Sequence, residues 1–481
     1  APFFESCDYV VLVVTACIVL YLFLTKHKNT WKKQGIAYES LSLIFRPLYQ
    51  LLIKPVDLPD QERYQKYGRL FGFFEAAKPC LMVAEPDLVK QVLVKDFNLL
   101  PNRMMFHLVQ ECVKITCNHL EEAAGNEEDT DMKEVYSHYA LDVIARCAFG
   151  TKVDSYTDTA NQFVTASQKA LGMGFSPLQL LSMLFPGLLK TLRIEAKAAA
   201  PFEYFRQLFR QIMAEREEKM LHQEDFLQLM IDAKQGHFAM AAESSIDAES
   251  KLFNIGSEAN SEPRASSNAL TEDEALAQCV AFFLAGQDTT ASTLAAAAYY
   301  LALNPQVQEK LRKEVDECFE AHGPEPSLDV TSKLKYLHCI VSETLRLLPP
   351  APRTQRVAST DYVLGETAIK VPKGCTVVIP IYSMHHDAEF FPEPERFDPD
   401  RFAENGDMVR PYTYIPFGAG PRNCIGMRLA LLSVKLCLLH CVHRVQFVCT
   451  QETRVPLQIK EGYGTLRVEG TVVGIRKRPT A

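Results

Sequence analysis

The fold of this chain is decided by one stretch near its C-terminal end, Phe417-Gly418-Ala419-Gly420-Pro421-Arg422-Asn423-Cys424-Ile425-Gly426. Two glycines ahead of the cysteine allow the backbone to turn tightly, and Gly426 allows a flat ligand to approach the chain closely. The apolar pattern predicts a helix over 426–443, whose N-terminus points at Cys424 and favours a thiolate over a thiol. A lone cysteine in an apolar segment is usually a core residue. The ten-residue pattern around Cys424 argues against that interpretation.

A long apolar helix is predicted well upstream of this stretch. Thr271 and Glu274 form a capping box at its start, and Asn304-Pro305 ends it. A helix that is apolar on all faces belongs in the centre of a large protein. Its middle reads Ala285-Gly286-Gln287-Asp288-Thr289-Thr290, where the glycine and a threonine hydroxyl can loosen helical hydrogen bonds and open a groove. A plain polar stripe is the alternative, but a buried aspartate needs a reason.

The apolar spacing in the rest of the sequence predicts a helix-rich fold with few strands. Further helices are expected over 85–94, 109–120, 132–149, 202–220, 225–233, 306–319 and 337–347, and short strands over 69–74, 79–83, 362–363 and 376–379. Residues 236–269 are rich in Ser, Ala, Asn and Glu with little apolar periodicity, which predicts a surface connector and not a domain boundary.

Two more motifs complete a resemblance to the cytochrome P450 superfamily. Glu343-Thr344-Leu345-Arg346 resembles its E-x-x-R helix, although an exposed pair at this spacing, worth a few tenths of a kcal/mol, is the alternative. Residues 397–402 (F-D-P-D-R-F) resemble its F-x-P-x-R-F segment, with Asp400 where Glu is usual. Within the superfamily, residues 225–232 and 452–457 resemble the third, drug- and steroid-oxidising family and thromboxane synthase. The resemblance covers roughly 64–478.

The resemblance implies a mostly α fold with a small β-rich subdomain, the triangular haem-thiolate monooxygenase fold. It implies haem (iron protoporphyrin IX) as cofactor, with Cys424 as the iron ligand, Arg422 and Arg356 on the propionates, and Phe417, Gly418 and Gly426 beside the ring. Asp288 and Thr289 would deliver protons. Glu343, Arg346 and Arg401 would form a buried, structural charge triad behind the cysteine loop. The substrate pocket would be bordered by Ala281, Phe282, Leu284, Ala285, Ala351, Pro352 and Arg353.

The implied reaction inserts one oxygen atom from O2 into small hydrophobic substrates such as xenobiotics, steroids or lipids. Electrons would come from an NADPH-dependent flavoprotein reductase, for which Arg428, Lys435, His440 and Arg444 offer a docking face. Two alternatives stay open: a peroxide-rearranging isomerase, which does not need the acid–alcohol pair, and a truncated, non-catalytic remnant with weak haem binding. Net charge is −8 and no Lys/Arg block stands out, so nucleic-acid binding has no electrostatic support.

The N-terminal region predicts contact with membrane lipid. Residues 9–24 form an apolar run followed by Lys26, Lys28, Lys32 and Lys33, which predicts a transmembrane anchor with the rest of the chain in the cytoplasm. A signal peptide is the weaker alternative, because no small-residue cleavage site is evident. We expect a connector over 25–63 with Trp31 beside the membrane, a catalytic domain over 64–481, and the endoplasmic reticulum membrane as location. The scattered cysteines also favour a reducing compartment.

One element of the resemblance is missing. After Asn102-Arg103 the family carries a helix with W-x-x-x-R, whose tryptophan and arginine bind the haem propionates. The only tryptophan of this chain is Trp31, so that helix is not present in its usual form. A stretch of some tens of residues is absent, together with one wall of the substrate pocket. We therefore expect weak haem binding.

Overall fold

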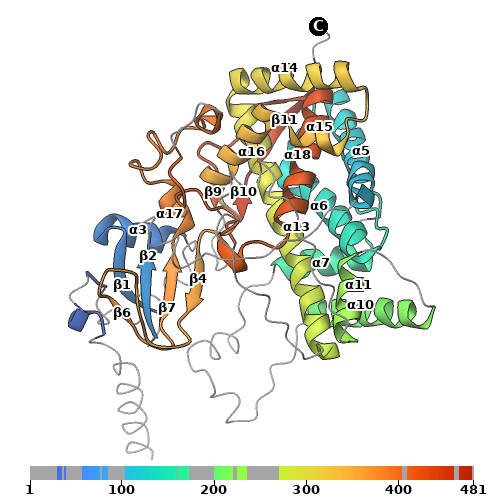
Figure 1. Ribbon diagram of the computed structural model, residues 1–481. Helices are drawn as coiled ribbons and strands as arrows, with labels where there is room; N and C mark the ends of the chain where they lie inside the picture. Colours follow the sequence, from blue (N-terminus) through green and yellow to red (C-terminus); the bar gives the residue numbers. More distant parts are fainter. Residues whose placement is uncertain are drawn as a thin grey trace, which may run out of the picture.

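The computed structural model describes residues 30–34, 37–39, 57–75, 78–84, 103–158, 160–172, 200–219, 225–235, 270–403, 409–459 and 465–478. A large helical body carries a smaller sheet-rich part at one side (Figure 1). The architecture confirms the predicted fold class, mostly α with small β-sheets.

The centre of the helical body is α13 (Glu272–Leu303), which runs through the molecule beside α6 (Met132–Phe149) (Figure 1). The capping box of Thr271 and Glu274 is present, and the helix ends at Asn304, as predicted. Gly286 allows the close approach of α6, because a Cβ atom added there would lie 2.7 Å from Cδ1 of Ile144. This glycine therefore serves helix packing, a role that the sequence did not suggest.

The other helices surround this pair. Their bounds are α3 (Asp57–Tyr67), α5 (Arg103–Gly125), α7 (Gln162–Gly172), α10 (Ala200–Glu218), α11 (Phe226–Lys234), α14 (Pro305–His322), α15 (Leu328–Ser332), α16 (Lys335–Leu347), α17 (Ile381–His385) and α18 (Met427–Arg444), with short 3-10 turns η1 (Lys32–Gln34), η3 (Pro399–Phe402) and η4 (Gly420–Arg422). One core joins α5, α6, α13, α16 and α18. A second, rich in phenylalanine, joins α6, α7, α10, α11 and α13.

The strands form small separate sheets. The largest has the order β1 (Leu70–Glu75), β2 (Lys78–Val83), β7 (Thr376–Ile379) and β4 (Thr354–Val357), with β2 and β7 parallel. The others are β3 (Asp129–Asp131), β11 (Val472–Lys477) and β8 (Val445–Val448), then β9 (Gln458–Ile459) with β10 (Val468–Glu469), and β5 (Tyr362–Val363) with β6 (Lys370–Val371). The chain leaves α16 through β4, which brings residues 351–356 near the helical body (Figure 1).

Trp31 is fully buried in the core of the sheet-rich part. Its Nε1 donates to the carbonyl oxygen of Phe73 at 3.2 Å. Gly72 makes room for the indole, since a Cβ atom there would lie 2.3 Å from Cγ of Trp31. Tyr38 forms an isolated parallel β-bridge with Gly72. Its burial under the sheet accords with the large free energy that an aromatic side chain gains when it leaves water.

Several predictions fall on residues outside the described part of the chain. These are the anchor over 9–24, the helix over 85–94 and the connector over 236–269. Among the helices that the structure describes, none has the length and apolar content needed to cross a bilayer.

Candidate active site

The cysteine loop joins η4 to α18. The backbone N–H of Cys424 donates to the carbonyl oxygen of Phe417 at 2.8 Å, which closes the loop. Gly418 and Gly420 have φ of 71° and 74°, the left-handed region that glycine adopts without strain. An added Cβ at Gly426 would meet no atom within 4 Å, so space is open beside the cysteine. The Cys424 side chain is exposed.

The protein alone does not make Cys424 a thiolate. Burial of one side of the thiol raises its pKa, and the backbone N–H of Gly426 opposes this rise only in part. A bound metal ion would deprotonate the thiol outright.

Two arginines meet beside this loop. Arg356, half-buried on β4, donates to the Thr354 hydroxyl at 3.2 Å and to the Gln355 carbonyl at 2.9 Å. Burial lowers the pKa of Arg356, and the positive charge of Arg422 lowers it further. In the described part of the chain, neither arginine has a carboxylate partner. Two adjacent cations without a counterion are suited to a ligand with two anionic groups, and together with the thiol they fit haem.

One face of α13 is open along its middle. Ala281 and Ala285 are exposed and Thr289 is half-buried, and their spacing of four residues places them on one side of the helix. The Thr289 hydroxyl donates to the Ala285 carbonyl at 2.7 Å. We call this stripe of Ala281, Ala285 and Thr289 the open face of α13.

The other residues that we expected at the pocket lie in different positions. Phe282 stacks on Phe226 of α11, with ring centroids 3.8 Å apart, and Leu284 packs against the phenylalanine-rich core. After α16, Ala351 is exposed, Pro352 is buried and Arg353 is half-buried. Some of the residues predicted to border the substrate pocket therefore lie at exposed surfaces, and others pack into the core.

Asp288 is buried and points into a cluster of polar groups. Its carboxylate lies 2.9 Å from Nζ of Lys133, 3.1 Å from Nε of Arg467 and 3.0 Å from the Thr465 hydroxyl. Burial acts to raise the pKa of Asp288, but the two cations outweigh it and hold the pKa below its ordinary value. The sequence analysis missed Lys133, Arg467 and Thr465, because they lie far from Asp288 in the chain and belong to no motif.

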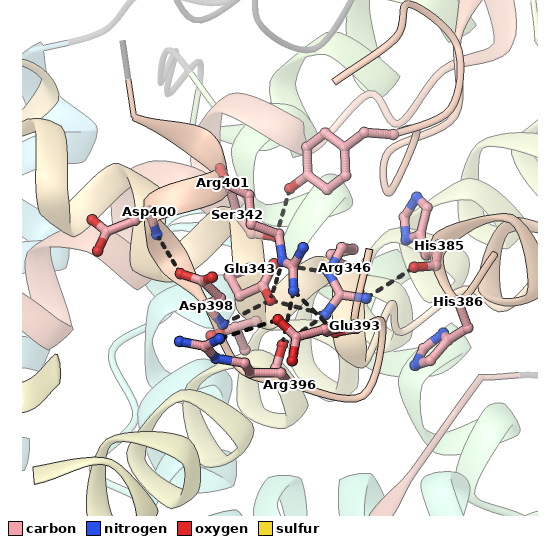
Figure 2. A network of polar contacts seen from close by, with 12 residues as sticks. Ser342, Glu343, Arg346, His385, His386, Glu393, Arg396, Asp398, Asp400 and Arg401 are labelled. Carbon is pink, nitrogen blue, oxygen red and sulfur yellow. Dashed lines mark hydrogen bonds and ion pairs between the residues drawn. The ribbon is translucent and has the colours of Figure 1, made fainter. Parts of the chain in front are cut away.

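The three charged residues behind the loop come together as an ion-pair cluster (Figure 2). Glu343 Oε2 and Oε1 accept from Nε and Nη2 of Arg346 at 2.8 and 2.9 Å, and Oε1 also accepts from Nε of Arg401 at 3.1 Å. The side chains of Glu343 and Arg346 have no exposed surface, so this is not a surface pair. Asp400, in contrast, is exposed and pairs with Lys310.

Two of the four residues that we expected to form a docking face on α18 are buried, whereas Arg428 and Arg444 are half-buried. Lys435 and His440 are 2% and 4% exposed, while Arg444 pairs with Glu121 at 3.7 Å. The helix is buried on nearly all sides in its second half, because α5, α14 and α16 pack around it. That part of the prediction was wrong.

Comparisons with known proteins show which family the chain resembles. The family model for cytochrome P450 matches residues 97–472. Cytochrome P450 3A41 of Mus musculus is 32% identical over 513 aligned positions, which cover 97% of this chain and 96% of the relative. Cytochrome P450 3A5 of Homo sapiens is 31% identical, with 96% and 95% covered. Since 513 positions exceed the 481 residues of this chain, the mouse relative carries at least 32 aligned residues that have no counterpart here.

Proposed function

The chain belongs to the cytochrome P450 family and is a haem-dependent monooxygenase, and we propose that Cys424 binds the haem iron beside the open face of α13. One observation carries this proposal. An exposed thiol, the space beside Gly426 and two arginines without carboxylate partners converge on one loop.

Each part of the loop would have its own task. Arg356 and Arg422 would bind the two propionates, and Phe417, Gly418 and Gly426 would let the ring lie flat against the chain. Glu343, Arg346 and Arg401 would hold the loop rigid from behind. Haem, once bound, supplies the activation of O2 through an electron-donating thiolate.

Proton supply would depend on α13. The Thr289 hydroxyl, now bonded to the Ala285 carbonyl, would turn toward the open face and release its proton there. Asp288 would restore that proton from the solvent side when its contact with Lys133 opens. Ionised Asp288 is suited to this task, because it can accept a proton and pass it on.

The substrates would be small and hydrophobic, such as xenobiotics, steroids or lipids. Ala281, Ala285, Ala351, Pro352 and Arg353 would border them, with Phe282 and Leu284 behind that wall. We further propose that an NADPH-dependent flavoprotein reductase supplies electrons. Residues 9–24 would anchor the protein in the endoplasmic reticulum membrane, with the catalytic domain over 64–481 facing the cytoplasm.

The assignment of Cys424 is tested by Cys424→Ser and Cys424→His. Either change should abolish the thiolate signature in the absorbance of the reduced, carbon monoxide-bound protein. Cys449 is a second exposed cysteine, so Cys449→Ser is the matched control and should keep the signature. A thiolate signature that survives in Cys424→Ser would show that the ligand is misassigned.

The role of Thr289 is tested by Thr289→Ala. This variant should retain haem but divert reducing equivalents to hydrogen peroxide, uncoupling them from product. Thr293, one turn later on α13, is buried and donates to the Thr289 carbonyl at 2.9 Å, so Thr293→Ala is the control for loss of a helix hydroxyl. Unchanged coupling in Thr289→Ala would remove this proton route.

A further inference from the structure

His385 lies beside Arg346 of the charge triad (Figure 2). It is the last residue of α17 and has no exposed surface. Its carbonyl oxygen accepts from Nη1 of Arg346 at 2.9 Å. Its ring stacks on Tyr414, with centroids 5.3 Å apart, and the Tyr414 hydroxyl donates to the Ser342 carbonyl on α16 at 3.0 Å. The ring is therefore fixed from two sides by the helix that carries the triad.

The ring of His385 holds the start of the cysteine loop. Its Nε2 lies 3.1 Å from the backbone nitrogen of Ile415 and accepts that N–H. The Ile415 carbonyl then accepts from Gly418 N–H at 2.9 Å, and the Phe417 carbonyl accepts from Cys424 N–H at 2.8 Å. A series of hydrogen bonds, joined by short stretches of the chain, therefore connects Arg346 to the backbone of Cys424.

This contact imposes one protonation state on the ring. Because Nε2 accepts a hydrogen bond, the imidazole is neutral and its proton is on Nδ1. Burial lowers the pKa of His385 and the positive charge of Arg346 lowers it further, while ring contacts with the backbone of Arg346 and Leu345 oppose this only in part. The ring therefore stays neutral, which keeps Nε2 available as the acceptor for the Ile415 N–H.

We propose that His385 is a positioning residue for the cysteine loop, which it holds through the backbone N–H of Ile415. The proposal rests on the proposed role of Cys424 as the iron ligand. The triad thus fixes the loop through two contacts of His385, the carbonyl to Arg346 and the ring to Ile415. Without the ring acceptor, residues 415–424 would move as a unit.

The test compares three variants of the full chain by hydrogen–deuterium exchange resolved at single amides. His385→Leu removes the acceptor, so the amides of Ile415 and Cys424 should both exchange about tenfold faster, the effect of losing one buried hydrogen bond. His385→Gln places an amide oxygen near the position of Nε2 and should restore protection. The neighbouring His386 bonds the Tyr382 carbonyl instead, so His386→Gln is the matched control and should exchange like the parent.

The carbon monoxide complex gives a second measurement. His385→Leu should lose the thiolate signature in a larger fraction of its haem than His385→Gln. If His385→Leu does not fold, His385→Asn replaces it, because its shorter amide cannot reach Ile415. The proposal is overturned if Ile415 alone loses protection while the Cys424 amide and the spectrum stay unchanged. Hydrogen–deuterium exchange requires no bound haem. It therefore tests the contact of His385 with the loop even if Cys424 is not the iron ligand.

Discussion

Lys133 and Asp288 form an ion pair between α6 and α13, with Nζ 2.9 Å from Oδ1. The same ammonium also donates to the Ser292 hydroxyl at 2.6 Å and to the Asp288 carbonyl at 3.1 Å. Asp288 is 8% exposed at its side chain and Lys133 is 18% exposed. This contact connects a proposed catalytic carboxylate to the solvent side of the helical body.

We expect Lys133→Met to destabilise the protein by about 2–3 kcal/mol at pH 7, since it leaves a buried carboxylate with Arg467 as its remaining cation. In the parent the pKa of Asp288 is lowered, so its contribution is present above the ordinary carboxyl pKa and is lost as pH falls through the lower folded value. The variant raises that pKa. The difference from the parent should therefore be full at pH 7 and shrink as the pH falls through the raised pKa of the variant toward the lower pKa of the parent, as urea unfolding can measure.

Asp288→Asn provides the control for this pair. Combined with Lys133→Met, it removes the unpaired charge, so the double variant should be more stable than Lys133→Met alone at pH 7. Additive losses in the two single variants would contradict a direct interaction between these side chains.

The packing of α6 on α13 predicts a second outcome. Gly286→Ala places a methyl group 2.7 Å from Cδ1 of Ile144 and should cost about 1–3 kcal/mol of unfolding free energy. Ile144→Val removes that Cδ1 atom, so it should recover much of the loss in the Gly286→Ala background. Denaturant midpoints of the four proteins measure the coupling. If Ile144→Val recovers none of the lost unfolding free energy, the loss in Gly286→Ala arises from the helix backbone and not from contact with Ile144.

The tryptophan site can be followed by fluorescence. Trp31 is the only tryptophan of the chain, so its emission reports one environment. Gly72→Ala would bring a methyl group within 2.3 Å of the indole Cγ and should displace the side chain toward water. We expect the emission to shift to longer wavelength. Gly172→Ala, whose Cβ would meet no atom within 4 Å, should leave the emission unchanged.

The sequence predicted those elements whose signals are local. The capping box, the apolar run of α13 and the glycines ahead of Cys424 each reveal a helix start, a buried helix or a tight turn within a few residues. The ends of α13 and the strands β1 and β2 accordingly agree with the prediction to within about one residue.

The sequence could not predict contacts between distant segments. Lys133 and Arg467 are ordinary basic residues until the fold brings them to Asp288. The burial of Lys435 follows from helices that pack on α18 from elsewhere in the chain. The burial of Trp31 could not be predicted for the same reason, because the sheet that covers it begins at Leu70.

The last prediction concerns haem retention. Haem would be held by an Fe–S bond, by apolar contacts and by donors to two propionates, and the charged donors that we propose here are Arg356 and Arg422. The W-x-x-x-R donors of the family have no counterpart, and each lost charged hydrogen bond costs roughly 1.5–3 kcal/mol. Two such losses weaken binding by orders of magnitude. We expect the chain to purify with less than one haem per molecule and to turn over slowly.

A variant with a family-like segment inserted after Arg103 should recover haem content and turnover. The same insertion with its tryptophan and arginine changed to alanine controls for added length and should recover neither. Haem per chain, from absorbance and iron analysis, is the measurement. His107 is a poor substitute donor. The charges of His107 and His440 both lower the pKa of Glu325, so the three side chains lie in one region. His440 is 13 residues into α18, which is about 20 Å along that helix from its start. If the unaltered chain holds one haem tightly, the expectation is wrong, and Arg103 at the start of α5 becomes the donor to mutate.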